Sequence, residues 1–157
     1  MSKAKKAKKD AKLSKSGYPF DEVTSAFHKA IRLGDEEQAL FWGIELYETS
    51  RTYFWKRVLI QAAEDVGLAA AEAVQQVTAL AQAWELCRRW SGFYVDPQHV
   101  VMAILLLARA PKSTEVDDAK NWVIQKRKGG WRPGVPEYAL DVHTEQGRQM
   151  GRTEEDW

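Results

Sequence analysis

The chain has 157 residues, enough for one domain, and its 45% content of hydrophobic residues can supply a core. A net charge of +1 excludes a strong overall field that would steer the protein to nucleic acid or membrane, and a single cysteine, Cys87, excludes an internal disulfide. No apolar run approaches the roughly 18 residues needed to cross a bilayer, so we expect a soluble, cytoplasmic protein without membrane contacts, with the nucleoid as a further location.

The first 17 residues are dominated by Lys, Ala and Ser. Such a segment has little to bury and cannot offset its ordering entropy, so we expect a disordered tail over residues 1–17. Its lysines could release counterions from nucleic acid by binding phosphates, or they could simply keep the protein soluble. The candidate nucleic-acid arm consists of Lys3, Lys5, Lys6, Lys8, Lys9 and Lys12.

Apolar residues spaced three and four apart predict helices from Phe20 onward. With their caps, we expect six main helices and no strand, over residues 21–33, 35–50, 52–66, 70–90, 96–110 and 113–128. Asp21, Asp35 and Asp96 have the side chains that N-caps require. Gly34 and Gly67 are expected to end helices, Gly67 in the left-handed C′ conformation. The pattern predicts an all-α compact bundle.

The fifth of these helices contains VVMAILLLA (100–108), which is apolar on most sides. We expect it to be the central helix that the others surround. The sixth should turn Val116, Ala119, Trp122 and Val123 inward. Beyond residue 130 the chain contains prolines and predicts an extended strap with one short helix near 144–150. We therefore expect a helical domain over 18–130, with 131–157 packing on it.

Seven tryptophans are many for this length. Trp90, Trp131 and Trp157 lie near element ends or in the strap, where an exposed aromatic would suit a protein contact. Core packing is the expected role of Trp42, Trp55, Trp84 and Trp122.

Chemical motifs are sparse. No GxxxxGK[ST] or GxGxxG loop occurs, and the histidines lie on three different elements with one cysteine, so we expect no cofactor and no metal. The densest polar cluster contains Asp141, His143 and Arg148. Asp141 could orient His143 as a general base, but the sequence nominates no nucleophile, and Asp141 or Thr144 could equally cap the short helix.

One stretch, RVLIQAAEDVGLA (57–69), puts Glu64 and Asp65 at a helix C-terminus. Acids there oppose the helix dipole at a cost of about 0.3–1 kcal/mol, so each should have a compensating donor. We expect Arg57 to pair with Glu64, and backbone N–H groups near residues 70–72 to bind Asp65. The hypothesis is that this pair locks the turn between the third and fourth helices.

The same stretch resembles the helix-ending motif R-x-x-x-x-A-x-E-D-I-G-L-A in the C-terminal domain of the MgsA/RarA AAA+ ATPases, relatives of Werner-helicase-interacting protein and of clamp-loader subunits. It matches at Arg57, Ala62, Glu64, Asp65, Gly67, Leu68 and Ala69. An upstream pattern, SAxHKSxRGSDxxAALYW, is matched at Ser25, Ala26, His28, Lys29, Arg32, Asp35, Ala39, Leu40 and Trp42. A downstream pattern, YLAxAPKS, is matched at Leu107, Ala108, Ala110, Pro111, Lys112 and Ser113.

The resemblance covers about residues 18–128 and weakens afterward, where PEYALDVHT (136–144) replaces the family's PxHLRNAPT. It implies a helical collar through which ATPase subunits assemble, as tetramers, at stalled or gapped replication DNA. The family's nucleotide-binding core is not matched, so its ATPase activity is not carried over.

Three hypotheses remain open. The first is a non-catalytic collar that self-associates, as a homo-oligomer, while the lysine arm holds DNA. The second is a monomeric adaptor that docks onto a separate ATPase or polymerase component through the strap and its tryptophans. The third is an enzyme that uses Asp141 and His143.

Overall fold

The computed structural model describes residues 12–91 and 96–156 of the chain. They form two compact units, one ending at Ala119 and one beginning at Lys120. The α-helices are α1 (Phe20–Leu33), α2 (Glu36–Thr49), α3 (Arg51–Gln61), α4 (Glu72–Ser91), α5 (Gln98–Arg109), α6 (Glu115–Lys128) and α7 (Glu145–Gln149). The described residues contain no strand, only an isolated bridge between Leu13 and Pro19, so the all-α prediction is confirmed.

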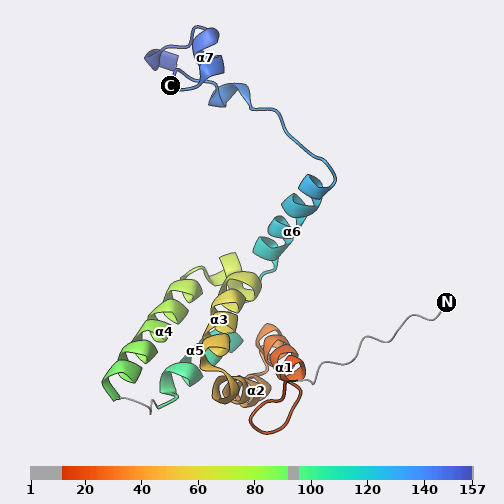
Figure 1. The fold of residues 1–157 in the computed structure, drawn as a ribbon, viewed down its shortest axis with the longest axis vertical. Coiled ribbons are helices and arrows are strands. Elements are labelled where there is room, and N and C mark those ends of the chain that lie inside the picture. Colours follow the sequence, from red (N-terminus) through yellow and green to blue (C-terminus); the bar gives the residue numbers. More distant parts are fainter. Residues whose placement is uncertain (1–11, 92–95, 157) are drawn as a thin grey trace, which may run out of the picture. The chain divides into compact units, whose positions relative to one another are not determined.

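Helix α5 lies at the centre of the first unit, where it contacts α1, α2, α3 and α4 (Figure 1). Its buried residues are Val100, Ala103, Ile104, Leu107 and Ala108. They recur at three- and four-residue intervals, so one broad face of α5 is covered by the four neighbouring helices. The prediction of a central fifth helix is confirmed, although Met102 remains exposed.

The junction between α1 and α2 follows local signals. Gly34 has φ 71° and ψ 21°, and the N–H groups of Gly34 and Asp35 bond to the carbonyls of Ile31 and Ala30. Asp35 then caps α2, where its Oδ1 accepts from the N–H of Gln38 at 3.1 Å. The prediction of an N-cap at Asp21 is wrong, because α1 begins one residue earlier and no side chain caps it.

Helix α2 approaches α1 and α5 closely at Gly43. A Cβ atom there would lie 2.5 Å from Ile104 Cδ1 and 2.9 Å from Phe27 Cε2. Such distances are too short for real carbon contacts, so a larger residue would have to displace two fully buried side chains, and glycine lets the three helices pack this tightly.

The tryptophans divide almost as expected. Trp55 and Trp84 are buried, and Trp84 Nε1 donates to Tyr47 Oη at 3.0 Å. Trp42 is partly buried against the core, as is Cys87. The prediction for Trp122 is wrong: 57% of its surface is exposed, and α6 has no buried residue at all. Four apolar residues at helical spacing indicate a face that could pack against another element, but they do not show that such an element is present.

Residues 12–17, which the sequence assigned to the tail, form a loop against α2. Glu45 is buried in this contact, where its carboxylate accepts from the N–H of Ser16 at 2.9 Å and from Ser16 Oγ at 2.8 Å. A hydrogen bond from Ser14, followed by those from Ser16, lowers the pKa of Glu45 against the effect of burial. The loop is therefore held by a charged acceptor that α2 provides.

Two kinds of feature are absent from the described residues. Among them, no helix is long and apolar enough to span a membrane. Within the same ranges, no group of three or more His, Cys, Asp and Glu side chains could hold a metal ion.

Candidate functional site

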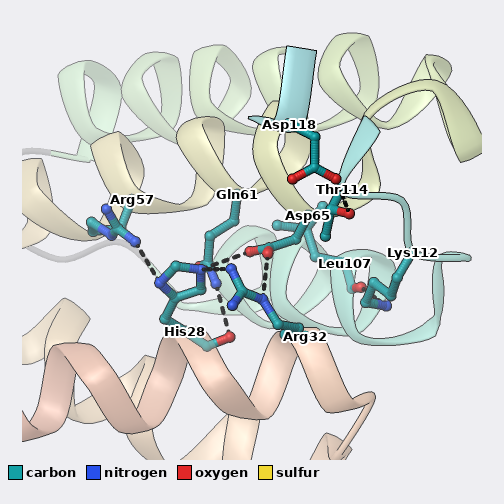
Figure 2. A network of polar contacts seen from close by, with 9 residues as sticks. All are labelled: His28, Arg32, Arg57, Gln61, Asp65, Leu107, Lys112, Thr114 and Asp118. Atoms are coloured by element: carbon teal, nitrogen blue, oxygen red, sulfur yellow. Dashed lines mark hydrogen bonds and ion pairs between the residues drawn. The ribbon is translucent and has the colours of Figure 1, made fainter. Parts of the chain in front are cut away.

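The end of α3 departs from an ordinary α-helix. After Gln61 the chain continues as a π-helical turn, Ala62–Val66, and then as a 3-10 turn, Gly67–Ala70. A π turn is wider than an α turn and commonly marks a site where side chains are re-aimed. Here the turn carries Asp65, whose side chain points toward α1 (Figure 2).

Gly67 ends the π turn with φ 51° and ψ −130°. The positive φ agrees with the prediction, but the ψ value does not belong to the left-handed helical region expected for a C′ glycine. This combination is accessible to glycine and strained for other residues. A Cβ atom at Gly67 would also lie 3.3 Å from Val116 Cγ2. The turn therefore requires glycine for a conformation that the sequence pattern did not specify.

The carboxylate of Asp65 binds two side chains of α1. Arg32 Nε donates to Oδ1 at 2.7 Å, and His28 Nε2 lies 2.8 Å from Oδ2. The prediction that backbone N–H groups near residues 70–72 would bind Asp65 is therefore wrong. The main-chain oxygen of Asp65 accepts from the N–H of Ser113 at 2.9 Å. Asp65 thus joins α1, the end of α3 and the segment after α5.

His28 is held on both of its ring nitrogens. Arg57 Nη2 lies 2.9 Å from Nδ1, and an arginine can only donate, so Nδ1 accepts. Arg32 Nη2 also lies 3.1 Å from Nε2, but the carboxylate of Asp65 is nearer, at 2.8 Å, so we assign the ring hydrogen to Nε2, where it faces Asp65. Arg57 bonds to His28 rather than to Glu64, so the predicted Arg57–Glu64 pair is wrong. Gln61 adds a contact from its Nε2 to the main-chain oxygen of His28 at 3.3 Å.

The charges in this network compensate one another. Burial would raise the pKa of Asp65, since its side chain has 0% exposure, but the hydrogen bonds from His28 and Arg32 outweigh burial and lower that pKa. The hydrogen bond between Arg32 and Asp65 also raises the pKa of Arg32. Asp65 is therefore a fully buried carboxylate that stays ionised, which is favourable only because two donors lie against it.

Lys112 lies next to this network and binds the C-terminal end of α5. Its Nζ donates to the main-chain oxygens of Leu107 and Ala108 at 2.8 and 3.0 Å, and also to that of Ala110. These are the free carbonyls at the C-terminus of α5, where a cation is favoured. Burial lowers the pKa of Lys112, while the charge of Asp65 acts in the opposite direction. The segment after α5 is thus fixed both by its own lysine and by Asp65.

The arrangement of these side chains is suited to holding the neighbouring helices in place. Oδ1 of Asp65 accepts from Arg32, Oδ2 lies 2.8 Å from His28 Nε2, and the carboxylate is out of contact with solvent, so its chemistry is that of a fixed acceptor. It connects α1, the end of α3 and the loop that leads to α6. The hypothesis of a lock between the third and fourth helices is corrected in its partners: the lock ties the π turn to α1 and to Ser113.

The remaining predicted residues lie elsewhere. Trp90 is 78% exposed at the end of α4, and Trp131 is 41% exposed in the second unit. Lys12 is the arm residue within the described part of the chain, and its Nζ lies 4.3 Å from the ring centroid of Phe20. Trp157 and the other arm residues, Lys3, Lys5, Lys6, Lys8 and Lys9, lie outside the described residues.

Asp141, His143 and Arg148 do come together, around the start of α7. Asp141 Oδ1 accepts from the main-chain N–H of His143 at 2.9 Å, and Arg148 Nη1 donates to the main-chain oxygen of His143 at 3.0 Å. The imidazole is exposed. Thr144 caps α7 by accepting from the N–H of Gly147 at 2.9 Å. Of the two residues predicted as candidates for this cap, Asp141 and Thr144, it is therefore Thr144 that caps the helix. These bonds order the turn before α7.

Sequence reasoning singled out Asp65, Arg57 and Gly67 but assigned no role to His28 or Arg32. A signal was present, because His28 and Arg32 are four residues apart and share one face of α1. This spacing indicates a polar pair on a core-facing helix, but it does not indicate which acidic residue would bind that pair.

Comparison with known proteins identifies the relatives of this chain. The family described as MgsA AAA+ ATPase C terminal matches residues 34–156. Replication-associated recombination protein A of Haemophilus influenzae is 32% identical over 137 residues, which cover 86% of this chain and 29% of that protein. The proteins of the same name from Bacillus subtilis and Escherichia coli are 30% and 29% identical, over 92% and 94% of this chain and 34% and 32% of their own lengths.

The chain thus spans about a third of the length of the curated relatives it matches. The family match covers well over half of the chain, from the end of α1 to the last described residue. The chain therefore belongs to the MgsA AAA+ ATPase C-terminal family.

Proposed function

We propose that this chain is a non-catalytic assembly domain of the replication-associated recombination ATPase family, whose first unit binds further copies of itself. Tetramers are the form that the resemblance to the family implies. The observation that carries the proposal is an open apolar groove on the first unit.

The groove lies between α3 and α4 and has a volume of about 500 Å³. Its lining residues are Leu59, Thr78, Ala81, Gln82, Glu85, Leu86 and Arg89. Glu85 at its edge is paired with Arg88 and Arg89 at 2.6 and 3.1 Å. An apolar centre with a charged, arginine-containing rim is typical of protein interfaces. Trp90 extends the apolar surface along α4.

A second copy is the occupant that fits the proposal, because α4 is itself a long helix with exposed apolar residues. Val74, Leu86 and Trp90 lie on its surface and could pack into the groove of a neighbour. Burial of such residues on association would stabilise the assembly by about 25 cal/mol for each Å² of apolar surface removed from water.

The test is a mass measurement by light scattering after size exclusion, over a range of protein concentrations. We expect a multiple of the 17.9 kDa chain mass, with four copies as the favoured number. Leu86→Lys should dissociate the assembly, because it places a charge in the groove. Leu33→Lys is the matched control, since Leu33 is 80% exposed and lies on α1, outside the groove.

A wild-type mass of one chain at all concentrations would overturn self-assembly and favour the monomeric adaptor. Unchanged assembly of Leu86→Lys would show that the groove is not the interface.

We propose in addition that the lysine arm contacts DNA. Replacing its lysines at positions 3, 5, 6, 8 and 9 by glutamine should weaken binding and flatten its salt dependence, by about 0.9 in the slope of log K against log salt for each phosphate that the arm no longer binds. Wild-type affinity and slope in that variant would remove the arm from the proposal.

A further inference from the structure

The second unit contains an exposed pair of tryptophans beside a basic helix end. Trp122 lies on α6, and Trp131 lies just beyond it, with ring centroids 5.6 Å apart and ring planes inclined by 61°. Their exposed fractions are 57% and 41%. Exposed tryptophan is unusual, because this side chain contributes more than most when it is buried. Two such rings in contact form an exposed aromatic surface on which a ligand could stack.

The turn after α6 creates this pair. The N–H of Trp131 bonds to the oxygen of Lys126 at 2.9 Å, and the N–H of Gly130 bonds to that of Arg127 at 3.1 Å. This is the Schellman pattern, which requires a left-handed residue, and Gly130 has φ 88°. The chain therefore folds back at glycine and brings Trp131 against the face of α6 that carries Trp122. The pair depends on a defined backbone turn.

The two rings are walls of an open hollow of about 600 Å³. Its other lining residues are Gln125, Lys126, Gly129 and Gly130. Because the rings are inclined, a flat group that stacks on one ring meets the edge of the other. Lys126 lies close by, with Nζ 5.9 Å from the ring centroid of Trp122. The hollow thus offers a π-face, an amide and a cation to one ligand.

The segment that forms the hollow is basic, and one of its cations, Lys126, lines it. The segment 119–132 has no acidic residue, and its basic residues are Lys120, Lys126, Arg127, Lys128 and Arg132. Arg132 Nη1 donates to the main-chain oxygens of Arg127 and Trp131 at 3.0 and 2.8 Å, which neutralises carbonyls at the helix end. A basic last turn complements the helix dipole, but the dipole does not account for two exposed aromatic rings. A ligand that is both flat and anionic accounts for both features.

We propose that Trp122 and Trp131, with Lys126, Arg127 and Lys128, form a binding site for single-stranded DNA. Bases stack on the tryptophans, and the backbone phosphates contact the basic side chains. Single strands are required because duplex bases already stack on one another and do not expose their faces. The choice of DNA over RNA rests on the proposed function; the stacking and charge argument does not depend on it.

The test uses the full chain and a fluorescein-labelled oligo(dT) of about 15 nucleotides, a length that suits a single-strand site of this kind. Binding is followed by fluorescence anisotropy and by quenching of tryptophan emission. Trp122→Ala and Trp131→Ala should each weaken binding by about 5- to 150-fold, the range that removal of one base–aromatic stack gives. Trp131→Phe should retain most of the affinity, because phenylalanine also stacks.

Tyr138→Ala is the matched control, because Tyr138 is a 91% exposed aromatic residue of the same unit that does not line the hollow. It should bind oligo(dT) like the wild type. A triple variant with glutamine at positions 126, 127 and 128 should lower the magnitude of the salt slope by about 2, at roughly 0.7 for each phosphate of a single strand that is no longer neutralised. The tryptophan variants should retain the wild-type slope.

Equal affinity of the wild type and both Trp→Ala variants, each shown to be folded by circular dichroism, would overturn the proposal. So would preference for a duplex of the same length, or tighter binding of oligo(U). These results differ from failure of the proposed function. A monomeric protein that still binds oligo(dT) through its tryptophans removes self-assembly and leaves this site, whereas an assembled protein without tryptophan-dependent binding does the reverse.

Discussion

Replacing Asp65 by asparagine should destabilise the first unit while changing little of its shape. Oδ1 could still accept from Arg32, but the amide would present N–H groups to His28 Nε2, the ring nitrogen to which we assign the hydrogen. His28 cannot readily exchange its hydrogen to Nδ1, because Arg57 donates to that nitrogen at 2.9 Å. The substitution therefore leaves a buried donor facing a donor.

The magnitude follows from the exposure of each partner. A hydrogen bond to a buried charged group contributes about 1.5–3 kcal/mol, and the bond from His28 falls in that range. Arg32 is 48% exposed, so water screens its interaction and reduces its contribution to about 0.5–1 kcal/mol. We expect Asp65→Asn to lower the free energy of unfolding by about 2–3 kcal/mol and the melting temperature by about 8–12 °C.

Urea unfolding followed by far-ultraviolet circular dichroism measures this change. Glu64→Gln is the matched control, because it removes the neighbouring carboxylate, which lies outside the pairs formed by Asp65. It should change the free energy of unfolding by less than about 0.5 kcal/mol. The reasoning would be refuted by a wild-type midpoint for Asp65→Asn, or by an equal loss in Glu64→Gln.

Two further predictions concern acid and packing. The pKa of Asp65 lies below its ordinary value, so its contribution is complete above the unfolded pKa of about 3.9 and is lost as the pH falls through the folded pKa. Urea titrations between about pH 6 and 3 should therefore show a steeper loss for the wild type than for Asp65→Asn, and parallel curves would contradict this sign. Gly43→Ala should destabilise the bundle by about 1–3 kcal/mol, because its Cβ would meet Ile104 and Phe27 at 2.5 and 2.9 Å. Calorimetry would test it, with Gly134→Ala as the control, since nothing lies within 4 Å of a Cβ at that position.

Features that depend on neighbouring residues in the chain were predictable. The stop at Gly34 and the cap at Asp35 follow from glycine in the left-handed region and an aspartate before a helix, and both occur. The cap of α7 by Thr144 has the same local origin. Such signals require no knowledge of the fold, because both partners lie within a few residues.

The partners of Asp65 were not predictable in this way. Arg32 is 33 positions away, and it reaches Asp65 only after α1 packs against α3 and the π turn re-aims the carboxylate. The sequence indicated that an acid at a helix end needs a donor, which is correct. It favoured the donors nearest in the chain, whereas the structure uses those nearest in space.

Helices α5 and α6 show how far an apolar pattern can be taken. Both carry apolar residues at helical spacing, yet α5 is covered by α1, α2, α3 and α4, and α6 buries none of its residues. The pattern indicates that a face gains free energy when it is removed from water, and it does not specify whether the cover belongs to the same chain. On α5 the cover is the bundle. On α6, Trp122 is joined by Trp131 and flanked by cations, so the same pattern there favours a flat anionic ligand over a hydrophobic core.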